Sequence, residues 1–184
     1  MSEQVILVSP DDIALGVATK KDVHRLGALH RAFSIFIFDS AGRMLLQRRA
    51  ITKYHSGGLW TNTCCSHPRP GESTRAAAQR RLFEEMGFHC PLQTAFSFVY
   101  RADVGDGLIE HEYDHVFVGH FEGDPAPDPG EVDDWGWFGT AAVLRDLHES
   151  PGRYTFWFRI AFAELRLREP QLFEVAAGGG VPYR

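Results

Sequence analysis

The pattern of apolar and polar residues predicts several β-strands. Residues 33–38 (FSIFIF) form an apolar run rich in β-formers, and residues 44–47 continue it after DSAGR, a favourable turn. We therefore expect a β-hairpin at this point of the chain. Two further strands are expected at 94–102 and 110–121, separated by the turn-prone segment VGDGL.

The segment between the hairpin and the first helix has a different composition. Residues 49–72 contain many Gly, Pro, His and Cys residues, which predicts a long functional loop around a short strand at 61–66. A second loop is expected at 123–130 (GDPAPDPG), followed by a short strand at 135–138.

Three segments have the spacing and end signals of helices. Residues 73–86 are rich in Ala, and Ser73 or Thr74 can cap them. A capped helix is expected at 140–148 and another helix at 154–168. Strands interspersed with a few helices predict a mixed α/β (α+β) fold.

The first predicted helix carries one apolar stripe. At 100° per residue, Ala78, Leu82 and Met86 share a face, and Glu85 lies at its edge rather than in open solvent. Gly87 can end the helix. We expect the stripe to be the buried face of the helix.

Composition and charge narrow the class of protein. No internal boundary divides residues 1–184, so we expect one domain, with a mobile tail from about residue 174. The net charge of −5 and the absence of a long basic run argue against nucleic acid as a partner. The chain has no signal-like start and no run long enough to span a membrane.

The cysteines indicate the compartment. Cys64, Cys65 and Cys90 are an odd number with two adjacent, which is a poor disulfide framework and typical of a reducing compartment. We therefore expect a cytoplasmic protein.

Several histidines and glutamates could bind a divalent metal such as Zn, Mn or Fe. The candidates are His24, His30, His67, Glu110 and Glu112. On a strand, Glu110 and Glu112 share a face and His111 points away. The alternative is that both glutamates are solvated and the histidines are ordinary.

The segment TNTCCSHP (61–68) contains a candidate thiol. In an extended segment Cys65 and His67 share a face while Cys64 takes the other. A thiol near a metal-bound histidine and arginines is expected to have a lowered pKa and to act as acid or base. The alternative is that each cysteine is a small buried apolar residue.

A group of cations suggests an anionic ligand such as a diphosphate, although a solvated charged face is the alternative for each member. The group comprises Lys20, Lys21, Arg48, Arg49, Lys53, Arg69, Arg80 and Arg81.

The helix segment GESTRAAAQRRLFEEMGF resembles the Nudix box, whose glutamates hold Mg²⁺ against a diphosphate. The matching positions are Glu72, Arg80, Leu82, Glu84, Glu85, Gly87 and Phe88. Two positions depart from the box, because Ser66 replaces its first Gly and Arg81 replaces the Glu that follows the Arg. The resemblance implies the Nudix-like fold, with a mixed sheet between helices, but weakens the expectation of hydrolysis.

Six segments in order, over residues 20–118, resemble type I isopentenyl-diphosphate isomerases. They are the spaced histidines up to LHRAFSIFIF, then LLQRR, GGLWTNTCCSHP, RRLFEEMG, FVYRA and IEHEYDHVF, with Trp157 as a later match. The resemblance implies an enzyme that interconverts isopentenyl and dimethylallyl diphosphate through a carbocation-like state, and we expect it to act as a monomer.

The resemblance also implies residue roles. Mn²⁺ or Zn²⁺ is expected at His24, His30, His67, Glu110 and Glu112, and Mg²⁺ at Glu85 and the Cys65 carbonyl. Cys65 and Glu112 are the expected acid–base pair, with either in either role, and Tyr100 and Trp157 assist them. The phosphates are expected to contact Lys20 (or its neighbour Lys21), Arg49, Lys53 and Arg81.

Two other functions remain open. A Nudix hydrolase would need the glutamate that Arg81 replaces and has no task for Cys65. A non-catalytic metal or phosphate-binding module would not need both an acid and a thiol.

Overall fold

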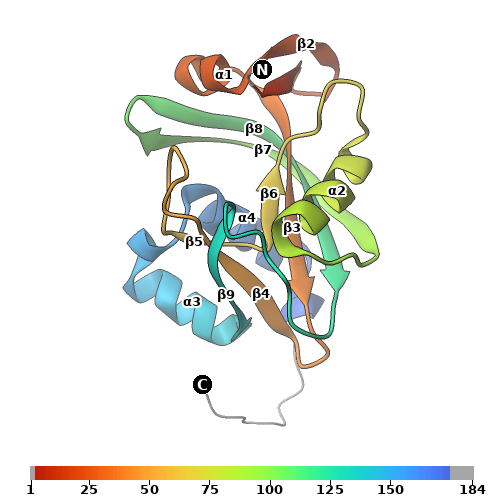
Figure 1. Cartoon of the computed structure of the whole chain (residues 1–184), viewed down its shortest axis with the longest axis vertical. Helices are drawn as coiled ribbons and strands as arrows, with labels where there is room; N and C mark the ends of the chain where they lie inside the picture. The colour runs from red at the N-terminus through yellow and green to blue at the C-terminus, as the bar shows by residue number, and fades with distance from the viewer. Residues whose placement is uncertain (1–2, 175–184) are drawn as a thin grey trace.

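The computed structural model describes residues 3–174, so the expected tail lies outside the described residues. Strand β3 (His30–Phe38) is the centre of a mixed sheet (Figure 1). It pairs in parallel along its whole length with β8 (Leu108–His120), which forms an antiparallel hairpin with β7 (Leu92–Gly105). On its other edge β3 pairs with the short strand β6 (Cys64–Ser66).

The predicted hairpin between the first two apolar runs is only partly present. Strand β4 (Arg43–Arg49) follows β3 after a tight turn, yet the two strands pair only at Phe38 and Met44. The edge of β3 beyond that pair is occupied by β6. Strand β4 instead pairs with β9 (Val132–Gly139) and with β5 (Trp60–Thr61).

The chain begins with three elements that the sequence pattern does not predict. These are β1 (Gln4–Val8), β2 (Ala14–Thr19) and helix α1 (Lys20–Leu26). Strand β2 is mostly exposed and α1 is only seven residues long, so neither has a strong periodic signal. Thr19 caps α1 by accepting a hydrogen bond from Asp22 N.

Helix α2 (Thr74–Met86) covers one face of the sheet with the predicted stripe. Its N-cap is Ser73, which accepts a hydrogen bond from Ala76 N. Gly87 ends it at φ +75°, and a Cβ there would lie 2.2 Å from the Ala126 carbonyl oxygen, so only glycine fits.

Helix α4 (Phe156–Arg168) covers the opposite face and begins two residues later than predicted, because Pro151–Arg153 form a 3₁₀ turn and Thr155 is the N-cap. Helix α3 (Thr140–Glu149) was predicted to be capped, but its N-cap is Gly139, which has no side chain to do so.

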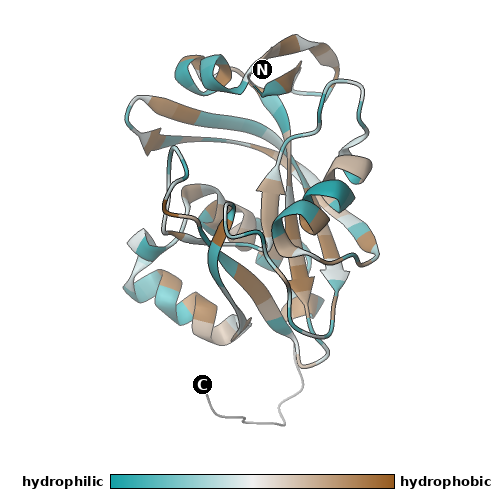
Figure 2. Ribbon diagram, viewed as in Figure 1, coloured by the Kyte–Doolittle hydropathy of each residue, from teal (hydrophilic) through white to brown (hydrophobic). Residues whose placement is uncertain are grey.

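The sheet therefore lies between α2 and α4, which confirms the predicted mixed fold with helices on both faces. Figure 2 shows hydrophobic residues concentrated on the central strands. No helix among residues 3–174 is long and apolar enough to cross a membrane.

Candidate active site

The register of the sheet brings together the first set of candidate metal ligands. His30 on β3 is paired directly with Glu112 on β8, and their Nε2 and Oε1 atoms are 3.6 Å apart. His67 follows β6 and places Nε2 3.1 Å from the same carboxylate oxygen and 3.2 Å from His30 Nε2. His24 on α1 completes a buried set whose donor atoms lie within 4.8 Å of one another.

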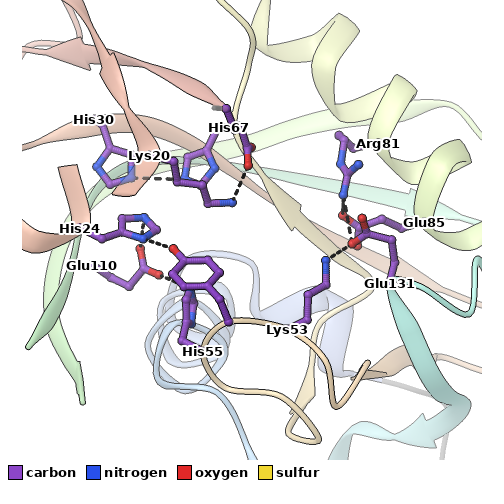
Figure 3. Close-up of polar contacts among 12 residues, drawn as sticks. Lys20, His24, His30, Lys53, His55, His67, Arg81, Glu85, Glu110 and Glu131 are labelled. Atoms are coloured by element: carbon purple, nitrogen blue, oxygen red, sulfur yellow. Dashed lines mark hydrogen bonds and ion pairs between the residues drawn. The ribbon is translucent and has the colours of Figure 1, made fainter. Parts of the chain in front are cut away.

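A second set adjoins the first and shares His24. The His24 Nε2 atom lies 3.4 Å from Glu110 Oε2, and His55 Nε2 lies 3.5 Å from Glu110 Oε1. His55 was missed by the sequence interpretation, although it lies inside the loop that was predicted to be functional. Figure 3 shows the four histidines of the two sets, His24, His30, His55 and His67, gathered with Glu110 around one centre.

The chemistry of these side chains fits a divalent cation. Burial and neighbouring histidines lower the pKa of His24 to about 3, and burial beside Lys20 lowers the pKa of His67 to about 4, so both rings are neutral and offer lone pairs. His24 Nε2 and Glu110 Oε2 are buried without a hydrogen-bond partner. Neutral imidazoles and buried carboxylates with unused lone pairs are typical of a transition-metal site.

The two glutamates have opposite protonation behaviour. Burial and the negative charge of Glu112 raise the pKa of Glu110 well above its usual value. Burial alone would raise the pKa of Glu112 too, but the neighbouring imidazoles of His30 and His67 lower it well below its usual value. Tyr100 on β7 also donates a hydrogen bond to Glu112 Oε2, at 2.6 Å. Glu112 is therefore an ionised carboxylate surrounded by donors.

Cys65 on β6 faces hydrogen-bond acceptors. Its thiol donates to Asn62 Oδ1 at 2.9 Å, and its sulfur lies 3.4 Å from Ser34 Oγ, which itself donates to Asp114. Burial and then the negative Asp114 raise the pKa of Cys65. The expected lowering of this pKa is wrong for the described protein, because the Cys65 thiol is buried against Asn62 and Ser34 and lies near the acidic Asp114. Cys64 is fully buried in the core on the other side of the sheet, as strand alternation predicts.

Trp157 is connected to Cys65 by a short series of buried hydrogen bonds. The indole Nε1–H donates to Thr61 Oγ1 at 3.0 Å, and Thr61 donates to Asn62 Oδ1 at 3.0 Å. Thr155, the cap of α4, also donates to Thr61. All the donors and acceptors of the Thr61 hydroxyl are thereby used, which fixes the ring relative to the sulfur.

Most of the predicted cations line a cavity of about 290 Å³ beside the thiol. Those on its wall are Lys20, Arg49, Lys53, Arg69, Arg80 and Arg81. Arg48 instead pairs with Asp133 and Asp134, and Lys21 is exposed outside this cavity. The cavity thus concentrates positive charge in an acidic protein, as an anionic ligand requires.

Acidic residues divide the cationic wall. Glu85 is buried, accepts from Arg81 at 2.5 Å and from Gln47 at 2.9 Å, and lines the cavity. Glu131 pairs with Lys53 and Arg81 (Figure 3). A carboxylate held in a basic cavity fits a Mg²⁺ ion that accompanies a phosphate group.

A smaller pocket of about 40 Å³ adjoins this cavity. Cys65, His67, Lys20 and Arg49 border both spaces, whereas the smaller one is closed by His55, Glu110, Glu112 and Trp157. The guanidinium of Arg49 lies 5.0 Å from the Trp157 ring centre. The site therefore has a cationic outer part and a narrow inner part with the thiol and Glu112.

This fold and site define a NUDIX domain protein, and the NUDIX domain family model matches residues 28–158. Solved structures at low identity share the fold. A protein of Deinococcus radiodurans superposes with a TM-score of 0.68 at 17% identity, covering 80% of this chain and 90% of that one. A MutT protein of Methanosarcina mazei gives a TM-score of 0.61 at 20% identity, covering 78% and 96%.

Three relatives are much more similar in sequence. Isopentenyl-diphosphate Delta-isomerase 1 of Aromatoleum aromaticum is 58% identical over 85% of this chain and 89% of its own. The corresponding enzymes of Serratia proteamaculans and Burkholderia multivorans are 54% and 53% identical, covering 92% and 86% of this chain and 94% and 90% of their own. The chain belongs to the isopentenyl-diphosphate Delta-isomerase family.

Proposed function

We propose that this protein interconverts isopentenyl and dimethylallyl diphosphate, with Cys65 and Glu112 as the two groups that exchange protons with the substrate. The named activity of its close relatives supports the reaction. One observation carries the residue assignment: the thiol and the ionised carboxylate line the same small inner pocket, directly beside a cationic cavity.

The cationic cavity suits the diphosphate. We assign phosphate contacts to Lys20, Arg49, Lys53 and Arg81, all of which line it. Glu85, with the Cys65 carbonyl, would hold Mg²⁺, which when bound would neutralise diphosphate charge that basic side chains alone balance only in part. Bound in this way, the substrate extends its five-carbon chain into the inner pocket.

The hydrogen-bond directions assign the resting protonation states. The Cys65 thiol donates to an amide oxygen, so it begins as the acid. Glu112 accepts a hydrogen bond from the Tyr100 hydroxyl, so it begins as the base. In the isopentenyl-to-dimethylallyl direction, the π electrons take the thiol proton at the terminal carbon and leave a thiolate and a tertiary cation. The electrons of a C–H bond at the methylene next to the cationic carbon then form the new double bond, and Glu112 accepts the released proton.

The inner pocket protects and stabilises the cation. The Trp157 ring is nearly buried and borders the pocket, and an aromatic face stabilises a desolvated cation by about 2 kcal/mol. The narrow volume excludes bulk water, which would otherwise trap the cation as an alcohol. A metal in the His/Glu site, Mn²⁺ or Zn²⁺ by its donor set, would keep Glu112 ionised and in position.

We further propose that the protein works as a cytoplasmic monomer with one domain. The proposed site needs no residue from a second copy, because its pockets are already lined on the thiol, carboxylate and cationic sides. Cys64, Cys65 and Cys90 are unpaired, which fits a reducing compartment.

The decisive assay follows isopentenyl diphosphate in the presence of Mg²⁺. We expect dimethylallyl diphosphate to form without release of phosphate, because Arg81 occupies the position of a Nudix-box glutamate. Exhaustive chelation should abolish turnover, and full recovery should need both Mg²⁺ and a transition metal. Phosphate release would favour the hydrolase, and full turnover without any metal would contradict both proposed metal sites.

The hydrogen bonds that connect Trp157 to Cys65 through Thr61 and Asn62 lead to another expected result. Replacing Thr61 with Val keeps the shape of the side chain but removes the hydroxyl that connects the Trp157 ring to Asn62. We expect kcat to fall about 10- to 100-fold with little change in KM, since misplacing a reacting group by about 1 Å costs about this much. Thr61→Ser should restore most of the rate.

Thr63→Val is the matched control. Its hydroxyl is equally buried and has two hydrogen-bond partners, the Ile37 N–H and the Leu45 carbonyl, against three for Thr61, and it touches no proposed catalytic group. Both variants should lose about 1–3 kcal/mol of stability, measured by urea unfolding. Equal losses of kcat in the two variants would show that Thr61 acts only through stability.

A further inference from the structure

His55 is a buried histidine that the assigned metal ligands do not include. It lies in the loop between β4 and β5, with a side chain only 7% exposed. Its ring packs edge-on against Trp157, with ring centres 5.6 Å apart. Nothing in this packing requires an imidazole, since an apolar ring would fill the same space.

One ring nitrogen of His55, Nε2, is directed at the metal centre, whereas Nδ1 lies 3.3 Å from Ser56 Oγ. Its Nε2 atom is 3.5 Å from Glu110 Oε1, too long for a good hydrogen bond. His24 Nε2 is 3.4 Å from the other Glu110 oxygen and has no hydrogen-bond partner, although it is buried. Neighbouring ligands at about 2.1 Å from one six-coordinate ion are about 3.0 Å apart, so both separations come within about 0.5 Å of those expected for ligands that share a cation.

We propose that His55 is a ligand of the transition-metal ion, so that one divalent cation is bound by four imidazoles and two carboxylates. His24 belongs to both donor sets and connects them, and Glu110 faces His55 and His24 with its two oxygens. The inference deepens the proposed function, because it rests on the same metal site. Four imidazoles favour Zn²⁺, Co²⁺ or Mn²⁺ over Mg²⁺.

This ligand would couple the metal to the diphosphate site. His55 is two residues from Lys53, which reaches the cationic cavity and pairs with Glu131. The loop is also held by Tyr54, whose hydroxyl contacts His24 Nδ1. A metal bound by His55 therefore fixes the loop that presents Lys53 to the phosphates.

Cobalt binding to the intact protein tests the proposal without substrate. We expect His55→Ala to bind Co²⁺ at least about 10-fold more weakly than wild type, because losing even an indirect partner of a ligand costs this much. Its visible spectrum should also change, as the ligand field loses an imidazole. His111→Ala is the matched control, since His111 contacts the Gly27 carbonyl instead of the site. An unchanged isotherm and spectrum in His55→Ala would overturn the proposal.

A second measurement needs no variant. X-ray absorption of the wild-type protein with one equivalent of Co²⁺ should count four imidazole ligands, and a count of three would overturn the proposal even if affinity falls in His55→Ala. Metal should also protect Lys53 from trypsin in wild type but not in His55→Gln. Because neither readout involves turnover, failure here remains distinct from failure to isomerise isopentenyl diphosphate.

Discussion

Replacing Cys65 with Ala is expected to lower kcat by about 10² to 10⁴, the range for removing one acid or base. The thiol borders the inner pocket and donates its proton to Asn62 Oδ1, so its loss removes the only S–H group at the reacting carbon chain. The variant should fold, retain its metal and bind the diphosphate, since the Cys65 carbonyl and the cationic wall remain. Turnover, metal content and substrate binding measured on one preparation would check all three.

Cys64 provides the matched control beside it. Its side chain is fully buried under α2, so Cys64→Ala should keep most activity and lose stability through a small cavity. An epoxide analogue of the substrate should label Cys65 and leave Cys64 unmodified. Label on Cys64, or normal turnover by Cys65→Ala, would show that a different group supplies the proton.

The second large effect is expected at the metal site. His67→Ala removes a buried proposed ligand whose Nε2 atom lies 3.1 Å from Glu112 Oε1 and 3.2 Å from His30 Nε2. We expect metal affinity to fall by at least about 10² and activity to be nearly lost, because the remaining proposed ligands no longer complete the coordination of the ion. Metal analysis of purified protein and a chelator competition would measure the first effect.

His111→Ala should retain metal and activity, since its ring points away from Glu110 and Glu112 and donates a hydrogen bond from Nδ1 to the Gly27 carbonyl. Equal metal loss in His67→Ala and His111→Ala would mean that metal loss reports general destabilisation of β8 and its neighbours, not removal of a ligand.

Most of the fold could be predicted because its main elements have strong local signals. Helix α2 has a cap at Ser73, a stripe of small and apolar residues and a stop at Gly87, and all three appear in the structure. The pairing of strands was harder, because β3 and β4 are adjacent in sequence but each pairs mainly with distant segments. Pairing depends on which edges remain free, and local patterns do not contain that information.

In the candidate site, too, the features with a local sequence signal were predicted and those that depend on distant or irregular segments were not. Strand alternation alone placed Glu110 and Glu112 on one face and separated Cys65 from Cys64, and the structure agrees with both. His55 was missed because it lies in an irregular loop, where no periodicity says which way a side chain points. The protonation of Cys65 was also mispredicted, since the buried Asp114 that raises its pKa is 49 positions away in the chain.

The hydrogen-bond series at Thr61 has a consequence for sequence variation. The Thr61 hydroxyl accepts from Trp157 and Thr155 and donates to Asn62, whose amide nitrogen in turn serves two backbone carbonyls. A single polar-to-apolar exchange anywhere in this series leaves a buried donor or acceptor unmatched. In a library randomised at positions 61, 62 and 155, active clones should therefore carry either the native residues or changes at two positions together, and intermediates with one change should be rare.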